Sequence, residues 1–180
     1  MLRAKIAVLA SGGGTNLQAL IDAEKSGILK SGEIVLVISN KADAYALTRA
    51  QKAGIETAAI TVQACGSRQK VEQSMLSFLQ ARGIDLVILA GFMMILSEQF
   101  VRQYPNRILN VHPSLIPSFC GEGFYGLRVH RAALDYGVKV TGATVHFVNE
   151  ITDGGKIVMQ KAVEVKEGDT PELLQKRVME

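Results

Sequence analysis

Residues 6–26 read IAVLASGGGTNLQALIDAEKS and contain a strand pattern, a loop and a helix pattern in succession. Ile6 to Ala10 is a continuous apolar run, which is typical of a parallel strand covered on both faces. From Leu17 to Ser26, apolar residues recur at helical spacing instead. The glycines between the two segments permit a tight turn. This stretch therefore predicts a strand followed by a helix, the repeating unit of an α/β fold.

The same alternation continues through the first two thirds of the chain. Further strand patterns cover residues 34–39, 57–61, 86–90 and 108–111, and helix patterns cover 44–53, 68–82 and 97–104. Strands that alternate with helices in this way favour a doubly wound, mainly parallel sheet. The fold class expected is therefore α/β, with a Rossmann-like arrangement.

The pattern changes after Val129. A short helix is expected at 130–136, followed by two long β-rich stretches at 139–148 and 156–165, which we interpret as antiparallel additions to the sheet. Thr170 and Pro171 then predict a helix start, because threonine caps helix N-termini and proline is favoured at the first helical position.

Composition indicates an ordinary globular protein. Of 180 residues, 48% are hydrophobic and 21% charged, which argues against disorder, so we expect a single domain over residues 1–180. The apolar runs are too short to span a bilayer. Met1 to Lys5 leads straight into a strand pattern and lacks the features of a signal peptide. A cytoplasmic enzyme without membrane partners is the expectation.

Charge and cysteine content exclude two further classes at this stage. The net charge of +3 is small and the basic residues are scattered, so no nucleic-acid partner is expected. Cys65 and Cys120 are isolated from other ligand-type residues, which predicts neither a metal site nor a disulfide. We expect both to be reduced thiols, with Cys120 serving as a small neutral filler in its loop.

The segment 108–117, ILNVHPSLIP, contains the best candidate for chemistry. Alternation on a strand points Asn110 and His112 to the same face, and Pro113 stiffens the chain after them. A carboxamide donor beside a titratable ring suits a reaction that builds negative charge on a carbonyl oxygen. His130 and His146 lack such neighbours, so we interpret both as structural.

Two other motifs have two interpretations each from the residues alone, and a third has one. The loop 11–16 could hold a phosphate on its backbone amides or form only a tight turn, and it fits neither the dinucleotide nor the Walker pattern. Asp153 could be the carboxylate that favours a charged His112, or part of a simple Asp-Gly turn. The apolar segment 89–96 reads as core.

Taken together, these motifs resemble the folate-dependent formyltransferase family over essentially all 180 residues. The family signature is Asn-x-His-Pro-Ser-Leu-Leu-Pro, matched at 110–117, with an aspartate some forty residues later, matched by Asp153. The N-terminal Ser-Gly-Gly-Gly-Thr-Asn at 11–16 is similar to the branch that acts on glycinamide ribonucleotide in purine synthesis. The resemblance implies a Rossmann-like formyltransferase fold.

The resemblance also implies roles for individual residues. The catalytic residues it implies are Asn110, His112 and Asp153; the phosphate-binding residues are Gly14, Thr15 and Asn16; the folate-binding residues are Arg68, Met93, Met94, Ile95 and Leu96, together with Asn110. Met94 stands where an arginine is common, and Arg128 where relatives often have a histidine. The loop 118–126 is longer than the linker of many relatives, and its glycines and aromatic residues indicate either a flap over the site or a plain surface loop. The family continues past the position of Glu180, so the chain is expected to be short at its C-terminus.

The activity implied is formyl transfer from 10-formyltetrahydrofolate, as co-substrate, to the amine of glycinamide ribonucleotide, without metal. No residue lies in an evident nucleophile motif, so direct attack by the amine is expected. The partners expected are these small molecules, and the chain is expected to be a monomer or homodimer. The alternatives are a formyltetrahydrofolate deformylase, a formyltransferase acting on methionyl-tRNA or an amino sugar, and a non-catalytic folate- or nucleotide-binding protein.

Overall fold

A computed structural model describes residues 3–179 of the chain. These residues form two compact units, and the boundary falls between Leu109 and Asn110, inside strand β5 (Ile108–His112). The expectation of one domain over residues 1–180 stays a prediction, and its outermost residues Met1, Leu2 and Glu180 lie outside the described part.

The first unit is built on parallel strands. They are β1 (Ala4–Ala10), β2 (Gly32–Ser39), β3 (Glu56–Ala59) and β4 (Leu86–Leu89), in the order β3-β2-β1-β4, with β5 next in the sheet. Each of the pairs β1–β2, β1–β4 and β2–β3 is parallel. The parallel sheet predicted from the sequence is confirmed, with strand boundaries shifted by one or two residues.

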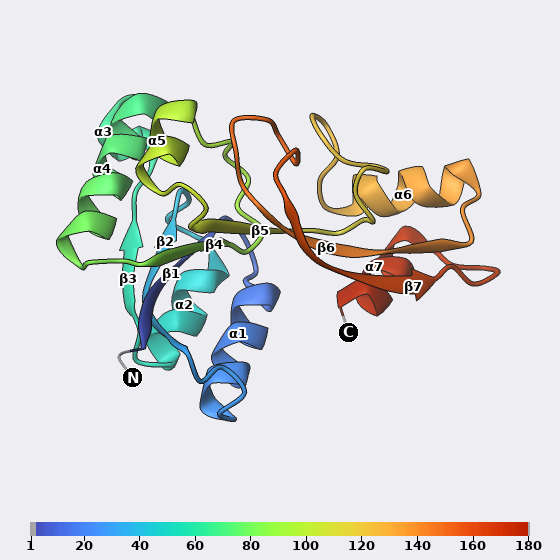
Figure 1. Ribbon diagram of the computed structural model, residues 1–180, viewed down its shortest axis with the longest axis horizontal. Helices are drawn as coiled ribbons and strands as arrows, with labels where there is room; N and C mark the ends of the chain where they lie inside the picture. The colour runs from blue at the N-terminus through green and yellow to red at the C-terminus, as the bar shows by residue number, and fades with distance from the viewer. Residues whose placement is uncertain (1–2, 180) are drawn as a thin grey trace. The chain divides into compact units, whose positions relative to one another are not determined.

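Helices cover both faces of this sheet (Figure 1). Helices α1 (Thr15–Lys25) and α2 (Tyr45–Lys52) lie side by side on one face, and α4 (Arg68–Ala81) and α5 (Glu98–Gln103) lie on the other. Ser67 and Ser97 cap α4 and α5 by accepting hydrogen bonds from backbone N–H groups three residues on, which explains where these helices begin. The short helix α3 (Val62–Cys65), capped by Thr61, was not predicted.

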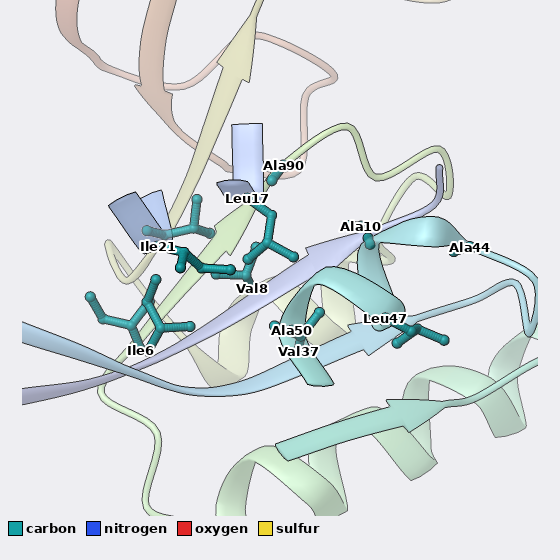
Figure 2. Close-up of a cluster of buried hydrophobic side chains, with 13 residues drawn as sticks. Ile6, Val8, Ala10, Leu17, Ile21, Val37, Ala44, Leu47, Ala50 and Ala90 are labelled. Atoms are coloured by element: carbon teal, nitrogen blue, oxygen red, sulfur yellow. The ribbon is translucent and has the colours of Figure 1, made fainter. Parts of the chain in front are cut away.

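Alternate residues of β1 place the core against α1 and α2. Figure 2 shows Ile6, Val8 and Ala10 directed toward Leu17 and Ile21 of α1, together with apolar residues of α2. Burial of a leucine or isoleucine of this kind contributes about 1.5–3 kcal/mol. This packing fixes the end of β1, from which the glycine loop departs.

The second unit combines an antiparallel pair with two helices. Strands β6 (Val140–Phe147) and β7 (Ile157–Glu164) pair antiparallel, as expected, and α6 (Leu127–Tyr136) packs against α7 (Pro171–Met179). The register of β6 shifts between Val145 and His146. Thr170 accepts a hydrogen bond from the N–H of Leu173 at 3.3 Å, which confirms it as the cap of α7. Within residues 3–179, none of the helices has the length and apolar character needed to cross a bilayer.

Candidate active site

The end of β5 and a turn after β6 bring three polar side chains together. Asn110 and His112 both approach Asp153: Nδ2 of Asn110 lies 3.5 Å from Oδ1, and Nδ1 of His112 lies 3.5 Å from Oδ2. The side chain of His112 is 5% exposed and that of Asp153 is 10% exposed. The structure therefore gathers the three residues that the sequence singled out around one poorly hydrated carboxylate.

The backbone of the turn explains its Asp-Gly-Gly sequence. Asp153 has a φ of 55°, in the left-handed region that aspartate tolerates better than most residues. A Cβ on Gly155 would lie 1.7 Å from the carbonyl oxygen of Phe147, so only glycine fits there. The N–H of Gly121 also donates a hydrogen bond to Oδ2 of Asp153 at 2.9 Å. The carboxylate is thus held by the turn on one side and by the 118–126 loop on the other.

Asp153 carries a negative charge at neutral pH. Burial raises the pKa of its carboxyl, but contact with His146, the hydrogen bond from Gly121 and the charges of His112 and His146 together outweigh burial, and the net pKa is lowered. A fixed negative charge beside an imidazole favours the imidazolium form.

The carbonyl of Phe119 determines which ring nitrogen of His112 carries a proton when the ring is neutral. Nε2 of His112 lies 2.9 Å from this oxygen, which can only accept, so Nε2 carries a proton. A second proton on His112 must therefore be at Nδ1, the atom nearest Asp153. The ring is consequently arranged to present an N–H of its charged form at Nδ1.

His146 is a member of this cluster that sequence reasoning placed outside it. Its Nε2 lies 3.1 Å from Nδ2 of Asn110 and 3.6 Å from Oδ1 of Asp153, and its Nδ1 lies 2.9 Å from the carbonyl oxygen of Phe147. Because the Phe147 carbonyl can only accept, Nδ1 carries a proton, and in the neutral form of the ring Nε2 is left as an acceptor for the Asn110 amide. The alternation that puts Thr144 and His146 on the buried face of β6 was the available signal.

His130 is buried apart from these contacts. It is fully buried, and neither ring nitrogen has a hydrogen-bond partner among residues 3–179. Burial lowers the pKa of His130, and the nearby charge of His112 lowers it further, so the ring is neutral at pH 7. Its position agrees with the structural interpretation from the sequence.

The glycine loop of the first unit is supported by α2. Gly14 has a φ of 72°, and a Cβ there would lie 2.8 Å from the backbone of Ala46. The N–H of Ala46 donates to the carbonyl of Gly12 at 3.0 Å, and Nε of Arg49 donates to that of Gly13 at 2.8 Å. Open space surrounds the Cβ positions of Gly12 and Gly13. The loop is therefore rigid on the α2 side and accessible on the other.

Thr15 and Asn16 form the first turn of α1, whose cap residue Gly14 offers no side-chain hydrogen bond. The first N–H groups of an α-helix have no intrahelical acceptor and carry a partial positive charge. Together with the adjacent open loop, this helix end has the properties of an anion site.

Three of the predicted folate residues line one cavity in the first unit. The cavity has a volume of about 430 Å³. It is lined by Arg68, Gln69, Glu72, Ile95, Leu96, Ser97 and Gln99. The guanidinium of Arg68 donates to the carbonyl of Ile95, and Glu72 accepts from the N–H of Ser97 at 2.9 Å.

Met93 and Met94 do not line this cavity. Met93 is half exposed, and its N–H donates to Oγ of Ser11 at 2.8 Å, while Met94 is buried. Of the predicted folate-binding residues in the first unit, Arg68, Ile95 and Leu96 therefore line the cavity. Met93 and Met94 precede Ile95 in the chain but do not line it. Within residues 3–179, no group of three or more histidine, cysteine, aspartate or glutamate side chains is arranged so that it could hold a metal ion.

Comparison with known proteins gives consistent matches along the chain. Residues 4–180 match the model of a family described as formyl transferase. The chain is 48% identical over 178 residues to the trifunctional purine biosynthetic protein adenosine-3 of Gallus gallus, covering 99% of this chain and 17% of that protein. It is 44% identical over 173 residues to the phosphoribosylglycinamide formyltransferase of Escherichia coli, covering 96% of this chain and 79% of that enzyme.

A solved structure gives the same picture. The glycinamide ribonucleotide transformylase 1 of Symbiobacterium toebii is 46% identical in sequence and superposes with a TM-score of 0.91, covering 98% of this chain and 81% of that one. The chain thus spans 17% of the length of the Gallus gallus protein and 79% of the length of the Escherichia coli enzyme.

Proposed function

We propose that this chain, which belongs to the formyl transferase family, transfers a formyl group from 10-formyltetrahydrofolate to the glycinamide amine of 5-phosphoribosylglycinamide in purine biosynthesis. The convergence of Asn110, His112 and Asp153 is the observation that carries the proposal. Relatives in sequence and in structure are known as phosphoribosylglycinamide formyltransferase and glycinamide ribonucleotide transformylase, which supports the choice of acceptor.

The chemical step is addition of the amine to the formyl carbon. The new N–C bond places negative charge on the formyl oxygen, and breaking of the bond to the folate nitrogen then releases tetrahydrofolate. Preorganised donors aimed at such an oxygen are worth about 3 kcal/mol each. The carboxamide of Asn110 and the imidazolium of His112 are the donors that this chain provides.

Asp153 and Phe119 prepare His112 for that role. The Phe119 carbonyl holds one proton on Nε2, and the charge of Asp153 favours a second on Nδ1. As the adduct forms, the attacking nitrogen becomes positive and must lose a proton. Asp153, ionised at neutral pH, is the group in the cluster able to accept it, and the same proton is then available for the folate nitrogen as the bond to the formyl carbon breaks.

His146 acts as a positioning residue for Asn110. By accepting one amide hydrogen at 3.1 Å, it decides which way the Asn110 carboxamide faces, because the amide oxygen cannot occupy that position beside an acceptor. The other amide hydrogen makes a long contact of 3.5 Å with Oδ1 of Asp153, which is weak enough to be exchanged for a hydrogen bond to the substrate oxygen. Preorganisation of this kind costs nothing at the moment of reaction.

Substrate binding is assigned to residues of the first unit. Gly14, Thr15 and Asn16 would hold the ribonucleotide phosphate at the start of α1, and the cavity containing Arg68 and Ile95 would take part of the folate. Binding energy from these remote groups positions the amine for attack. The proposed partners are these two small molecules. The predictions that the protein is a monomer or homodimer and that it is cytoplasmic stay predictions.

Turnover by the purified protein tests the proposal. 10-Formyltetrahydrofolate is supplied with glycinamide ribonucleotide, with methionyl-tRNA, with an amino sugar nucleotide, or with no acceptor. We expect tetrahydrofolate release only with the ribonucleotide, together with formylated product. Release at an equal rate without acceptor would identify a deformylase, and release with another acceptor would replace the proposed substrate. Absence of turnover with every acceptor would favour the alternative of a non-catalytic folate- or nucleotide-binding protein.

A further inference from the structure

The first unit contains a groove between α1 and α2 that the proposed reaction does not use, and we propose that it binds a diphosphate group. Its volume is about 290 Å³, and α1 and α2 run beside each other in Figure 1. The residues that line it are Gln18, Lys25, Tyr45, Arg49, Lys52 and Ala53. Three of these six carry a positive charge.

The three positive charges have no carboxylate partner. Within residues 3–179, Lys25, Arg49 and Lys52 take part in none of the ion pairs. Lys25 and Lys52 lie in the last turns of α1 and α2, where the helix dipole stabilises cations. Like charges gathered around one groove repel each other, and an anion bound among them relieves that repulsion.

Arg49 is held in position by neighbouring groups. Its Nε donates to the carbonyl of Gly13 at 2.8 Å, its Nη1 donates to Oε1 of Gln18 at 3.1 Å, and its guanidinium lies 5.0 Å from the centre of the Tyr45 ring. The amide of Gln18 in turn donates to Oδ1 of Asp22 at 2.9 Å.

These contacts use two of the three guanidinium nitrogens. The third, Nη2, makes no hydrogen bond within residues 3–179. A guanidinium already fixed by two hydrogen bonds loses little side-chain entropy when it binds an anion. Arg49 is therefore a preorganised donor, whereas Lys25 and Lys52 supply mobile charge.

The size of the groove selects among anions. At about 290 Å³ its volume is just below the range of small-molecule sites, which is roughly 300–1,000 Å³. A compact group with two or three negative charges fits both this volume and the three cations. A diphosphate meets that description, and it occurs free as pyrophosphate and as part of nucleoside diphosphates.

Isothermal titration at low ionic strength, with inorganic pyrophosphate, ADP or adenosine, tests this proposal. The test variant is Lys25→Gln/Lys52→Gln, and the matched control is Lys70→Gln, which removes an exposed lysine on α4. We expect pyrophosphate to bind the unaltered protein and the control equally. The double variant should bind about tenfold more weakly, since each exposed charge pair lost is worth a fewfold in affinity.

The ligands distinguish the source of the diphosphate. Binding of ADP as well as pyrophosphate would identify a nucleotide site, whereas pyrophosphate alone would identify a site for the free anion, and both support the proposal. Absence of pyrophosphate binding, or equal binding by the double variant, would overturn it, the latter by placing the anion elsewhere, for example at the glycine loop. Adenosine binding as tightly as ADP would also overturn it.

Discussion

Asp153 is the residue on which the chemistry of this chain depends most. It contacts three side chains that matter for the proposed reaction, Asn110, His112 and His146, and its own conformation is imposed by a turn that accepts only glycine at Gly155. Its negative carboxylate therefore lies beside both proposed donors, Asn110 and His112. A change at this residue should affect rate far more than folding.

We expect Asp153→Asn to lower kcat by on the order of a hundredfold, the effect of losing one charged donor. Asparagine has the same shape but no charge, so the electrostatic attraction to a positive His112 and the proton acceptor for the amine are both lost. Steady-state kinetics of both proteins measure the loss, and thermal unfolding checks that the variant is folded. An unchanged kcat in a folded variant would limit Asp153 to a role in the turn.

At the scale of single elements, the glycine loop joins β1 to α1 and is shaped by α2. The family resemblance assigns Gly14 to the phosphate site. A side chain at this position would collide with Ala46, so Gly14 is required by helix packing and by its positive φ. The open positions Gly12 and Gly13 are the places where a side chain would face a ligand.

The two neighbouring glycines therefore form a matched pair. Gly14→Ala should lower the free energy of unfolding by about 1–3 kcal/mol, because of backbone strain and the collision with α2. Gly13→Ala should leave the melting temperature nearly unchanged and raise KM for the ribonucleotide. Thermal unfolding and steady-state kinetics of both variants measure these effects. An unchanged KM for the ribonucleotide in a folded Gly13→Ala protein would contradict the assignment of the phosphate-binding site to this loop.

Helix α7 is tied to the preceding loop by a paired carboxylate. Arg177 makes two hydrogen bonds to Asp169, at 2.6 and 2.7 Å, and the N–H of Lys166 donates a third at 2.8 Å. The Arg177 hydrogen bonds, followed by that of Lys166, lower the pKa of Asp169 to about 2. The side chain is 3% exposed. The charged form of Asp169 is thus favoured by folding.

The pH dependence of stability follows from the direction of this shift. The contribution of Asp169 should be complete above about pH 4, the unfolded value, and should disappear as pH falls toward 2. Asp169→Asn should lower stability at pH 7 and flatten the stability profile in that window. Glu167→Gln, two residues away, is the control. Denaturant unfolding at several pH values provides the measurement, and a profile for Asp169→Asn that matches the unaltered protein would contradict this assignment.

How far the sequence predicts these elements depends on whether a feature is local. Strand and helix periodicity and the Thr170 cap are local, and the structure confirms them. The position of His146 depends on the shift in register between β6 and β7 and on the turn that places Asp153 against it. Such contacts join residues that are far apart in the chain, and local sequence patterns do not predict them. The burial of Met94 agrees with the interpretation of segment 89–96 as core, whereas the exposure of Met93 in the same segment does not.

At the scale of the whole molecule, the proposed function assigns distinct tasks to the two units. The first contains the glycine loop and the cavity with Arg68, and the second contains Asn110, His112, His146 and Asp153. Family membership and the polar cluster support a single account, in which the amine attacks the formyl carbon directly. This account assigns no covalent role to a side chain, including Cys120.

Cys120 is the residue against which direct transfer is best tested. It adjoins Gly121, which holds Asp153, and burial followed by the charge of Asp153 raises the pKa of its thiol. A raised pKa leaves less thiolate, so Cys120 is a poor nucleophile at neutral pH. A formyl-enzyme at this position would nevertheless be detectable after acid quenching.

The most direct test follows the formyl group itself. The protein is mixed with 10-formyltetrahydrofolate labelled in the formyl carbon and with glycinamide ribonucleotide, and the reaction is quenched with acid during the first turnover. We expect the label in unreacted donor and in formylated ribonucleotide, with none on the protein and none released as formate. Label on the protein would contradict direct transfer, and label recovered mainly as formate would contradict the proposed acceptor.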